Sequence, residues 1–86
     1  MKTNFVMLKE LLEIYHPEDM GFISHDERLL IEKTLCLHDM DILALRNLRD
    51  FVVLFLSSRE DRESWDQMSA ITHVIDMEIS YNGGII

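Results

Sequence analysis

Hydrophobic side chains recur at intervals of three and four residues in four segments of this chain, and that period constrains the fold more than any other feature. Side chains at such intervals lie on one face of an α-helix, so each segment is predicted to form an amphipathic helix. The first spans residues 5–15 and ends at His16, because Pro17 disfavours helical geometry in the residue before it. The predicted core stripe of this helix is Phe5, Leu8, Leu11, Leu12 and Tyr15.

The second predicted helix begins after Ser24. Ser24 and Glu27 have the spacing of a capping box, in which Ser24 accepts from the backbone N–H of Glu27 and the Glu27 side chain reaches back. This helix is predicted to run to about Leu37. Asp39 and Asp41 follow, and either one fits as the N-cap of the next helix.

The third segment, residues 42–57, has one apolar stripe: Leu45, Leu48, Val52, Phe55 and Leu56. Its second half, residues 51–56, is apolar on every side. By residue type this run also fits a buried β-strand. A helix is preferred, because the run continues the register of residues 42–50 without a break and no partner strand is apparent.

The fourth segment follows a second possible capping box, formed by Ser58 and Asp61, and ends before residues 82–84. Its predicted stripe is Trp65, Met68, Ile71, Thr72, Ile75 and Ile79. The predicted fold is therefore all-α: a single helical domain, residues 1–86, built as a small compact bundle or array of about four helices. Ile85 and Ile86 have no assigned role.

The charge of the chain restricts its partners. Sixteen Asp and Glu residues stand against eight Lys and Arg, which gives a formal net charge of −8. This charge repels phosphate backbones and anionic lipid, so neither direct nucleic-acid binding nor membrane binding is expected. It favours encounter with a basic protein surface.

Location is inferred from three features of the sequence. The single cysteine, Cys36, cannot form an intramolecular disulfide, and no signal peptide is recognised at the amino terminus. The longest apolar run, residues 51–56, is far short of the roughly 20 residues that span a bilayer. We expect a cytoplasmic protein.

Four potential metal ligands lie close together in the sequence: Cys36, His38, Asp39 and Asp41. They lack the second Cys/His pair of a zinc motif and the glycine of a calcium loop. Cys36 has no oriented base and is expected to be a small buried side chain. With three glycines, the chain has no phosphate-binding loop either. We therefore expect no enzyme activity, no cofactor and no metal.

The third segment has more hydrophobic side chains than one stripe requires. Leu43, Val53 and Leu54 lie with Arg46 and Asp50 on the opposite side of the predicted helix. Either this helix is central in the bundle or its second face binds another chain. The second interpretation predicts a homodimer through these five residues.

These observations favour a non-enzymatic interaction protein that occupies a surface of a partner protein, as an inhibitor, immunity-type, adaptor or regulatory factor. The first alternative is an acidic nucleic-acid mimic. Its carboxylates would come from one patch of Glu60, Asp61, Glu63 and Asp66 and another of Glu18, Asp19, Asp26 and Glu27. The second alternative is a helix-turn-helix transcriptional regulator, with Arg46 and Arg49 facing DNA.

Overall fold

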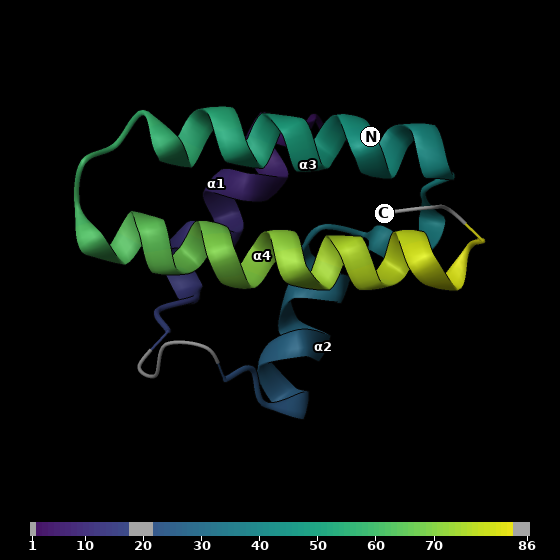
Figure 1. The fold of residues 1–86 in the computed structure, drawn as a ribbon, viewed down its shortest axis with the longest axis horizontal. Helices are drawn as coiled ribbons and strands as arrows, with labels where there is room; N and C mark the ends of the chain where they lie inside the picture. The colour runs from purple at the N-terminus through teal and green to yellow at the C-terminus, as the bar shows by residue number, and fades with distance from the viewer. Residues whose placement is uncertain (1, 18–21, 84–86) are drawn as a thin grey trace.

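Over residues 2–17 and 22–83, which the computed structural model describes, the chain forms four α-helices and one short 3-10 helix. These elements are α1 (Asn4–Ile14), α2 (His25–Thr34), η1 (Leu37–Asp39), α3 (Ile42–Ser57) and α4 (Arg62–Tyr81). The all-α prediction is confirmed, and residues 51–56 are helical. α3 and α4 lie side by side and antiparallel, while α1 crosses behind them and α2 packs against α4 (Figure 1).

Side chains cap the amino termini of the four α-helices. Thr3 and Ser24 accept from the N–H groups of Val6 and Glu27, each at 3.2 Å. The cap at Ser24 was predicted, but within the described residues the Glu27 carboxylate accepts from the Tyr15 hydroxyl, at 3.0 Å, instead of reaching back to Ser24. Each cap satisfies a donor that the helix itself leaves unpaired.

The caps of α3 and α4 are both aspartates. Asp41, one of the two residues proposed from sequence, accepts from Ala44 N–H at 2.8 Å. The predicted start of α4 at Ser58 is wrong. Ser58 instead donates to the carbonyl of Phe55, at 2.7 Å, and Asp61 is the N-cap, accepting from Ser64 N–H at 2.8 Å.

α2 ends three residues earlier than predicted because the backbone turns at Cys36. Cys36 has a φ of 55°, the left-handed conformation that closes many helices. Leu35 and Leu37, on either side of it, are both fully buried. Alternate residues of a continuous helix point in nearly opposite directions, so the turn allows both leucines to reach the core. The Cys36 side chain is exposed, contrary to its expected burial.

The core lies mainly between α3 and α4. The predicted stripe of α3 is confirmed for Leu45, Leu48, Val52 and Leu56, which are fully buried, while Phe55 is half-buried. Full burial of an aliphatic side chain of this size contributes about 1.5–3 kcal/mol. This pairing is therefore a main source of stability, and α4 contributes the facing side chains Ile71, Val74, Ile75 and Ile79.

The predicted stripe of α4 is wrong at its first position, whereas Met68 packs against the core and Ile71, Ile75 and Ile79 are buried. Trp65 is exposed, and the neighbouring positions Ser64 and Gln67 are buried. The Gln67 side-chain amide donates to the carbonyl of Tyr15, at 2.8 Å, and so links α4 to the end of α1. A buried polar group with a partner costs little, so polar residues occupy the inward face here. Phe5, also assigned to the core, is about half exposed.

Several expectations fall on Glu18, Asp19, Ile85 and Ile86, which lie outside the described residues. Within the described parts of the chain, none of the helices combines the length and apolar character that crossing a bilayer requires.

Candidate functional site

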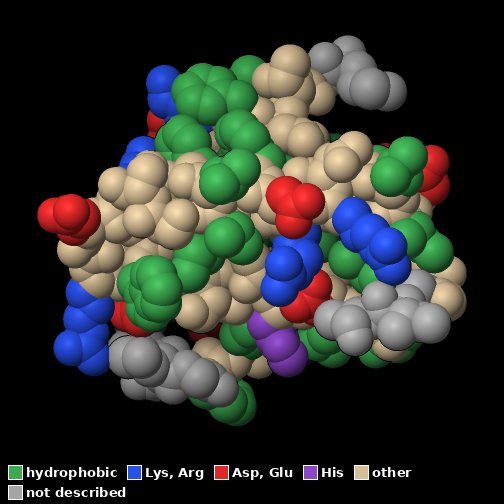
Figure 2. All heavy atoms as spheres, turned by 45° about the horizontal axis from the view of Figure 1, so that its top comes forward, with side chains coloured by type: hydrophobic (Ala, Val, Ile, Leu, Met, Phe, Trp, Pro, Cys, Tyr) green, Lys and Arg blue, Asp and Glu red, His purple; other side chains and the backbone are tan. Residues whose placement is uncertain are grey.

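The outer face of α3 is exposed at both ends. Leu43 and Leu54 are 70% and 71% exposed, whereas Val53 is partly buried. The two leucines are eleven positions apart, about 16 Å along a helix, and the exposed side chains of Asn47 and Asp50 lie between them. α3 is therefore not surrounded by its neighbours. The exposed leucines of the predicted interface lie at the two ends of its outer face, with polar side chains between them. Figure 2 likewise shows hydrophobic side chains in separate patches on this surface.

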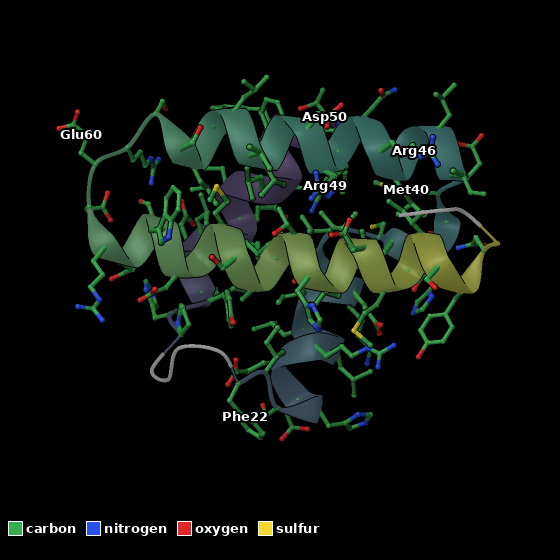
Figure 3. All side chains as sticks on the ribbon, in the orientation of Figure 1. Phe22, Met40, Arg46, Arg49, Asp50 and Glu60 are labelled. Carbon is green, nitrogen blue, oxygen red and sulfur yellow. The ribbon has the colours of Figure 1, made fainter. Side chains whose placement is uncertain are left out.

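The charged residues of α3 point in different directions. Asp50 points away from α4, whereas Arg49 points toward it (Figure 3). The Arg49 guanidinium pairs with Asp76 of α4, with 2.6 Å between Nε and Oδ1. Arg49 thus forms an ion pair between the two long helices. Arg46, like Asp50, is exposed.

One end of the α3 face continues into a group of aromatic rings. Phe5 of α1 contacts Phe55 of α3 edge to face, and Phe55 stacks on Phe51; both centroid separations are 5.8 Å. Leu54 lies one turn from Phe51 on the same helix surface. Phe5, Phe51, Leu54 and Phe55 are called the aromatic patch below.

Two cations lie beside the aromatic patch. The Lys9 ammonium is 6.0 Å from the centroid of the Phe5 ring, and the Arg59 guanidinium is 4.8 Å from that of Phe55. Both fall within the range of cation–π attraction. Sequence reasoning assigned Phe5 and Phe55 to the core stripes, because periodicity does not distinguish a buried ring from one at the edge of the core.

The predicted acidic patch is partly used within the fold. Asp61 caps α4, and its hydrogen bonds with Ser64 hold its pKa below the ordinary value. Glu63 pairs with His16 across 2.7 Å, and this hydrogen bond raises the pKa of His16. Glu60 points away from the molecule at the α3–α4 turn (Figure 3), and Asp66 is half-buried. These four carboxylates do not form a uniform anionic surface.

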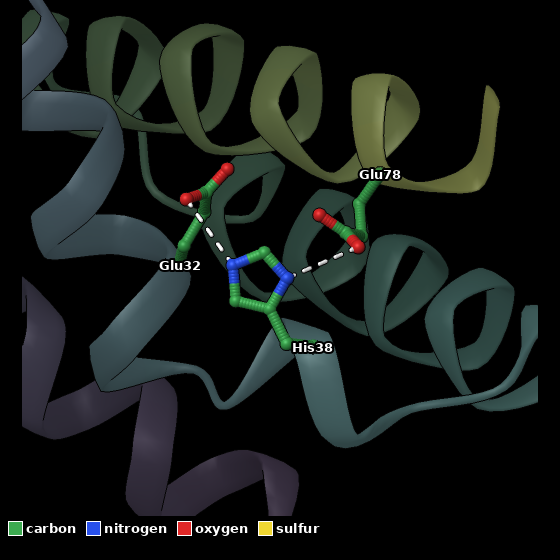
Figure 4. A group of neighbouring side chains, drawn as sticks. All are labelled: Glu32, His38 and Glu78. Carbon is green, nitrogen blue, oxygen red and sulfur yellow. Dashed lines mark ion pairs between the residues drawn. The ribbon is translucent and has the colours of Figure 1, made fainter. Parts of the chain in front are cut away.

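A third group of side chains was not predicted. Glu32 of α2, His38 of η1 and Glu78 of α4 converge so that three potential ligand atoms lie within 4.8 Å of one another (Figure 4). His38 Nε2 is 3.4 Å from Glu32 Oε2, and His38 Nδ1 is 3.3 Å from Glu78 Oε2. We refer to these three residues as the Glu–His–Glu cluster.

The two carboxylates of the cluster are buried and the imidazole is not. The side chains of Glu32 and Glu78 are 7% and 9% exposed, against 64% for His38. Arg28 Nε contacts the second oxygen of Glu32 at 3.0 Å, and the Asn82 amide lies 3.4 Å from Glu78 Oε2. Arg28 thus holds Glu32 by the oxygen that does not face His38, Asn82 contacts the Glu78 oxygen that does, and the imidazole faces solvent.

Of the four ligands close in sequence, His38 alone joins this cluster of described residues. The Cys36 thiol donates to the Lys33 carbonyl at 3.7 Å, and Asp41 caps α3. The partners of His38 lie 6 and 40 residues away in the chain, at spacings that match no metal motif. Only the packing of α2 and η1 against α4 brings them together.

Comparison of the chain with protein-family models, with curated proteins and with solved structures gives no match.

Proposed function

We propose that this chain is a non-enzymatic interaction protein that binds a surface of another protein through the aromatic patch. The single observation that supports this is the exposure of Leu54 beside the Phe51–Phe55 stack and the half-exposed ring of Phe5. Aromatic side chains provide large contact areas at little entropic cost and are enriched at protein interfaces. Leu54 is the one residue that this patch shares with the interface predicted from the sequence.

The proposed partner has a basic surface. The net charge of −8 gives the protein a field that attracts such a surface over several ångströms and repels acidic competitors. In this proposal apolar contact at the aromatic patch supplies affinity, and the net negative charge of the whole protein raises the encounter rate. A reducing cytosol is the proposed location, because the exposed Cys36 is a free thiol.

Self-association through the same patch is part of the proposal, because a twofold interface allows one patch to cover its copy. Leu43, at the far end of α3, provides the matched control since it is equally exposed. Analytical ultracentrifugation should show a dimer for the wild type and for Leu43→Lys, and a folded monomer for Leu54→Lys. Both substitutions add one lysine to the same helix, so the overall charge change is identical.

A wild type that stays monomeric at high concentration would remove self-association from the proposal. Partner binding is then tested separately by affinity capture, with the wild type and Leu54→Lys as paired baits. The proposal requires a basic protein that the wild type retains at low salt, that salt weakens, and that Leu54→Lys fails to retain. Equal capture by both baits would contradict it.

The two alternative functions have less support in the geometry. For a nucleic-acid mimic, Asp61 and Glu63 already bind groups of their own chain. For a helix-turn-helix regulator, Arg49 pairs with Asp76 and Asp41 caps the amino end of the would-be recognition helix. Displacement of the captured partner by duplex DNA would favour the mimic, and a mobility shift with DNA at low salt would favour the regulator.

A further inference from the structure

The Glu–His–Glu cluster places two carboxylates where water is largely excluded. Burying a carboxylate is costly unless a positive group compensates its charge. Arg28 provides that charge for Glu32. Within the described residues the ion pair of Glu78 is with His38, whose imidazole also faces Glu32. An imidazole carries at most one positive charge, and it is shared between two anions.

We propose that Glu32, His38 and Glu78 bind one divalent first-row transition metal ion, with Zn²⁺ as the representative case. Neutral imidazole and carboxylate oxygens are common ligands of such ions. The ion supplies two positive charges to the space between the buried carboxylates. It thereby compensates both anions more completely than a histidine can.

The ligand atoms of the cluster lie close enough for one ion to draw them together. Zinc bonds of about 2.0–2.2 Å place tetrahedral ligand atoms roughly 3.3–3.6 Å apart. One ligand atom from each residue, all within 4.8 Å of one another, is available to the ion, so the set must contract by up to about 1.2 Å when it binds. Each ring nitrogen now faces a different carboxylate, so one nitrogen must turn toward the ion. The exposed position of His38 on a one-turn helix permits this rotation.

The surroundings of the cluster also suit a metal site. Ligating carboxylates in metal sites are themselves held by hydrogen bonds. Arg28 binds Glu32 Oε1 and leaves Oε2 for the ion, and Asn82 lies next to Glu78 Oε2. Three protein ligands leave one position of a tetrahedral ion open on the solvent side of His38, where water can bind. The ion would join α2, η1 and α4, and so fasten the end of the bundle.

The test is a titration of untagged, metal-free protein with Zn²⁺ by calorimetry, together with thermal unfolding at each metal concentration. The wild type should bind one Zn²⁺ per chain, and its melting temperature should rise with zinc because the ion binds the folded state. His38→Ala should weaken binding at least tenfold and abolish the thermal shift. Since His38 is exposed, this variant keeps its core, which circular dichroism verifies.

Two further arms separate this site from general attraction of cations to an acidic protein. His73→Ala removes an exposed histidine that lies on α4 outside the cluster, and this variant should bind zinc like the wild type. Mg²⁺, which prefers all-oxygen ligands, should bind far more weakly than Zn²⁺. Glu78→Gln should lose zinc binding as His38→Ala does. Equal zinc affinity in the wild type and His38→Ala, equal binding of Mg²⁺, or no response of the wild type to zinc would each overturn the proposal.

Discussion

Replacing Gln67 with glutamate tests the buried link between α4 and the end of α1. The Gln67 side chain is buried, and its amide donates to the Tyr15 carbonyl at 2.8 Å. Glutamate has the same shape but, when ionised, has no proton to donate. It then places a negative charge against the carbonyl oxygen. When protonated, its hydroxyl can donate to the same oxygen.

The loss of stability caused by Gln67→Glu depends on pH. The unfolded variant has an ordinary glutamate with a pKa of about 4.3. In the folded variant the buried carboxyl keeps its proton, so its pKa is raised. Stability is therefore greatest below the unfolded pKa and is lost as pH rises, by about 1.4 kcal/mol per pH unit until the folded pKa is reached. At pH 7 the free energy of unfolding is therefore lower by up to about 3.7 kcal/mol, because the folded variant must keep a proton that the unfolded variant has released.

Urea unfolding followed by circular dichroism at pH 5.5, 6.5 and 7.5 measures this dependence. Ser69→Glu is the matched control, because it adds a carboxyl group to an exposed position of the same helix. The stability difference between Gln67→Glu and Ser69→Glu should widen by more than 1 kcal/mol across this range. A difference that stays constant with pH would refute the buried hydrogen bond as the function of Gln67.

Three further predictions concern other contacts. Asp41→Ala should lower the free energy of unfolding by about 0.5–2 kcal/mol, because it removes the cap of α3. Asp39→Ala should change it by less than about 0.5 kcal/mol, and equal effects of the two variants in urea unfolding would contradict the assignment of the cap. Burial, and secondarily the hydrogen bond to Glu27, raises the pKa of Tyr15, so the free energy of unfolding should fall as pH rises above 10. Phenolate absorbance at 295 nm should show one tyrosine that ionises well above pH 10, and this tyrosine should be missing in Tyr15→Phe. The hydrogen bond to Glu63 raises the pKa of His16, so the NMR titration midpoint of His16 should lie above about 6.5 and should fall in Glu63→Gln. A midpoint that is the same in the wild type and in Glu63→Gln would exclude this pair in solution.

The features that the sequence predicted correctly depend on local interactions. The cap at Ser24 joins residues three apart, and the stripe through Leu45, Leu48 and Val52 follows from helical periodicity alone. Ser58 was assigned wrongly because its hydroxyl has a second local partner, the carbonyl of Phe55 behind it. Sequence spacing does not indicate which of the two bonds forms.

The features that the sequence missed depend on tertiary contacts. Gln67 is buried because Tyr15, 52 residues earlier, offers it a carbonyl. Glu78 lies beside His38 only after α4 has packed on η1. The exposure of Cys36 follows from the need to bury a leucine on each side of it. Hydrophobic periodicity contains no information on such pairs, so neither the Glu–His–Glu cluster nor the burial of Gln67 was predictable.

The pairing of α3 with α4 has a consequence for synthesis of the chain. The ribosome completes the apolar stripe of α3 before it makes any of α4, which covers much of that stripe. Until residues 62–81 emerge, Leu45, Leu48, Val52 and Leu56 lack the side chains that bury them. Such exposed surface makes folding intermediates prone to aggregation and attracts chaperones. A nascent chain whose α3 has emerged ahead of α4 therefore exposes a surface that chaperones can bind, and packing of α4 covers it.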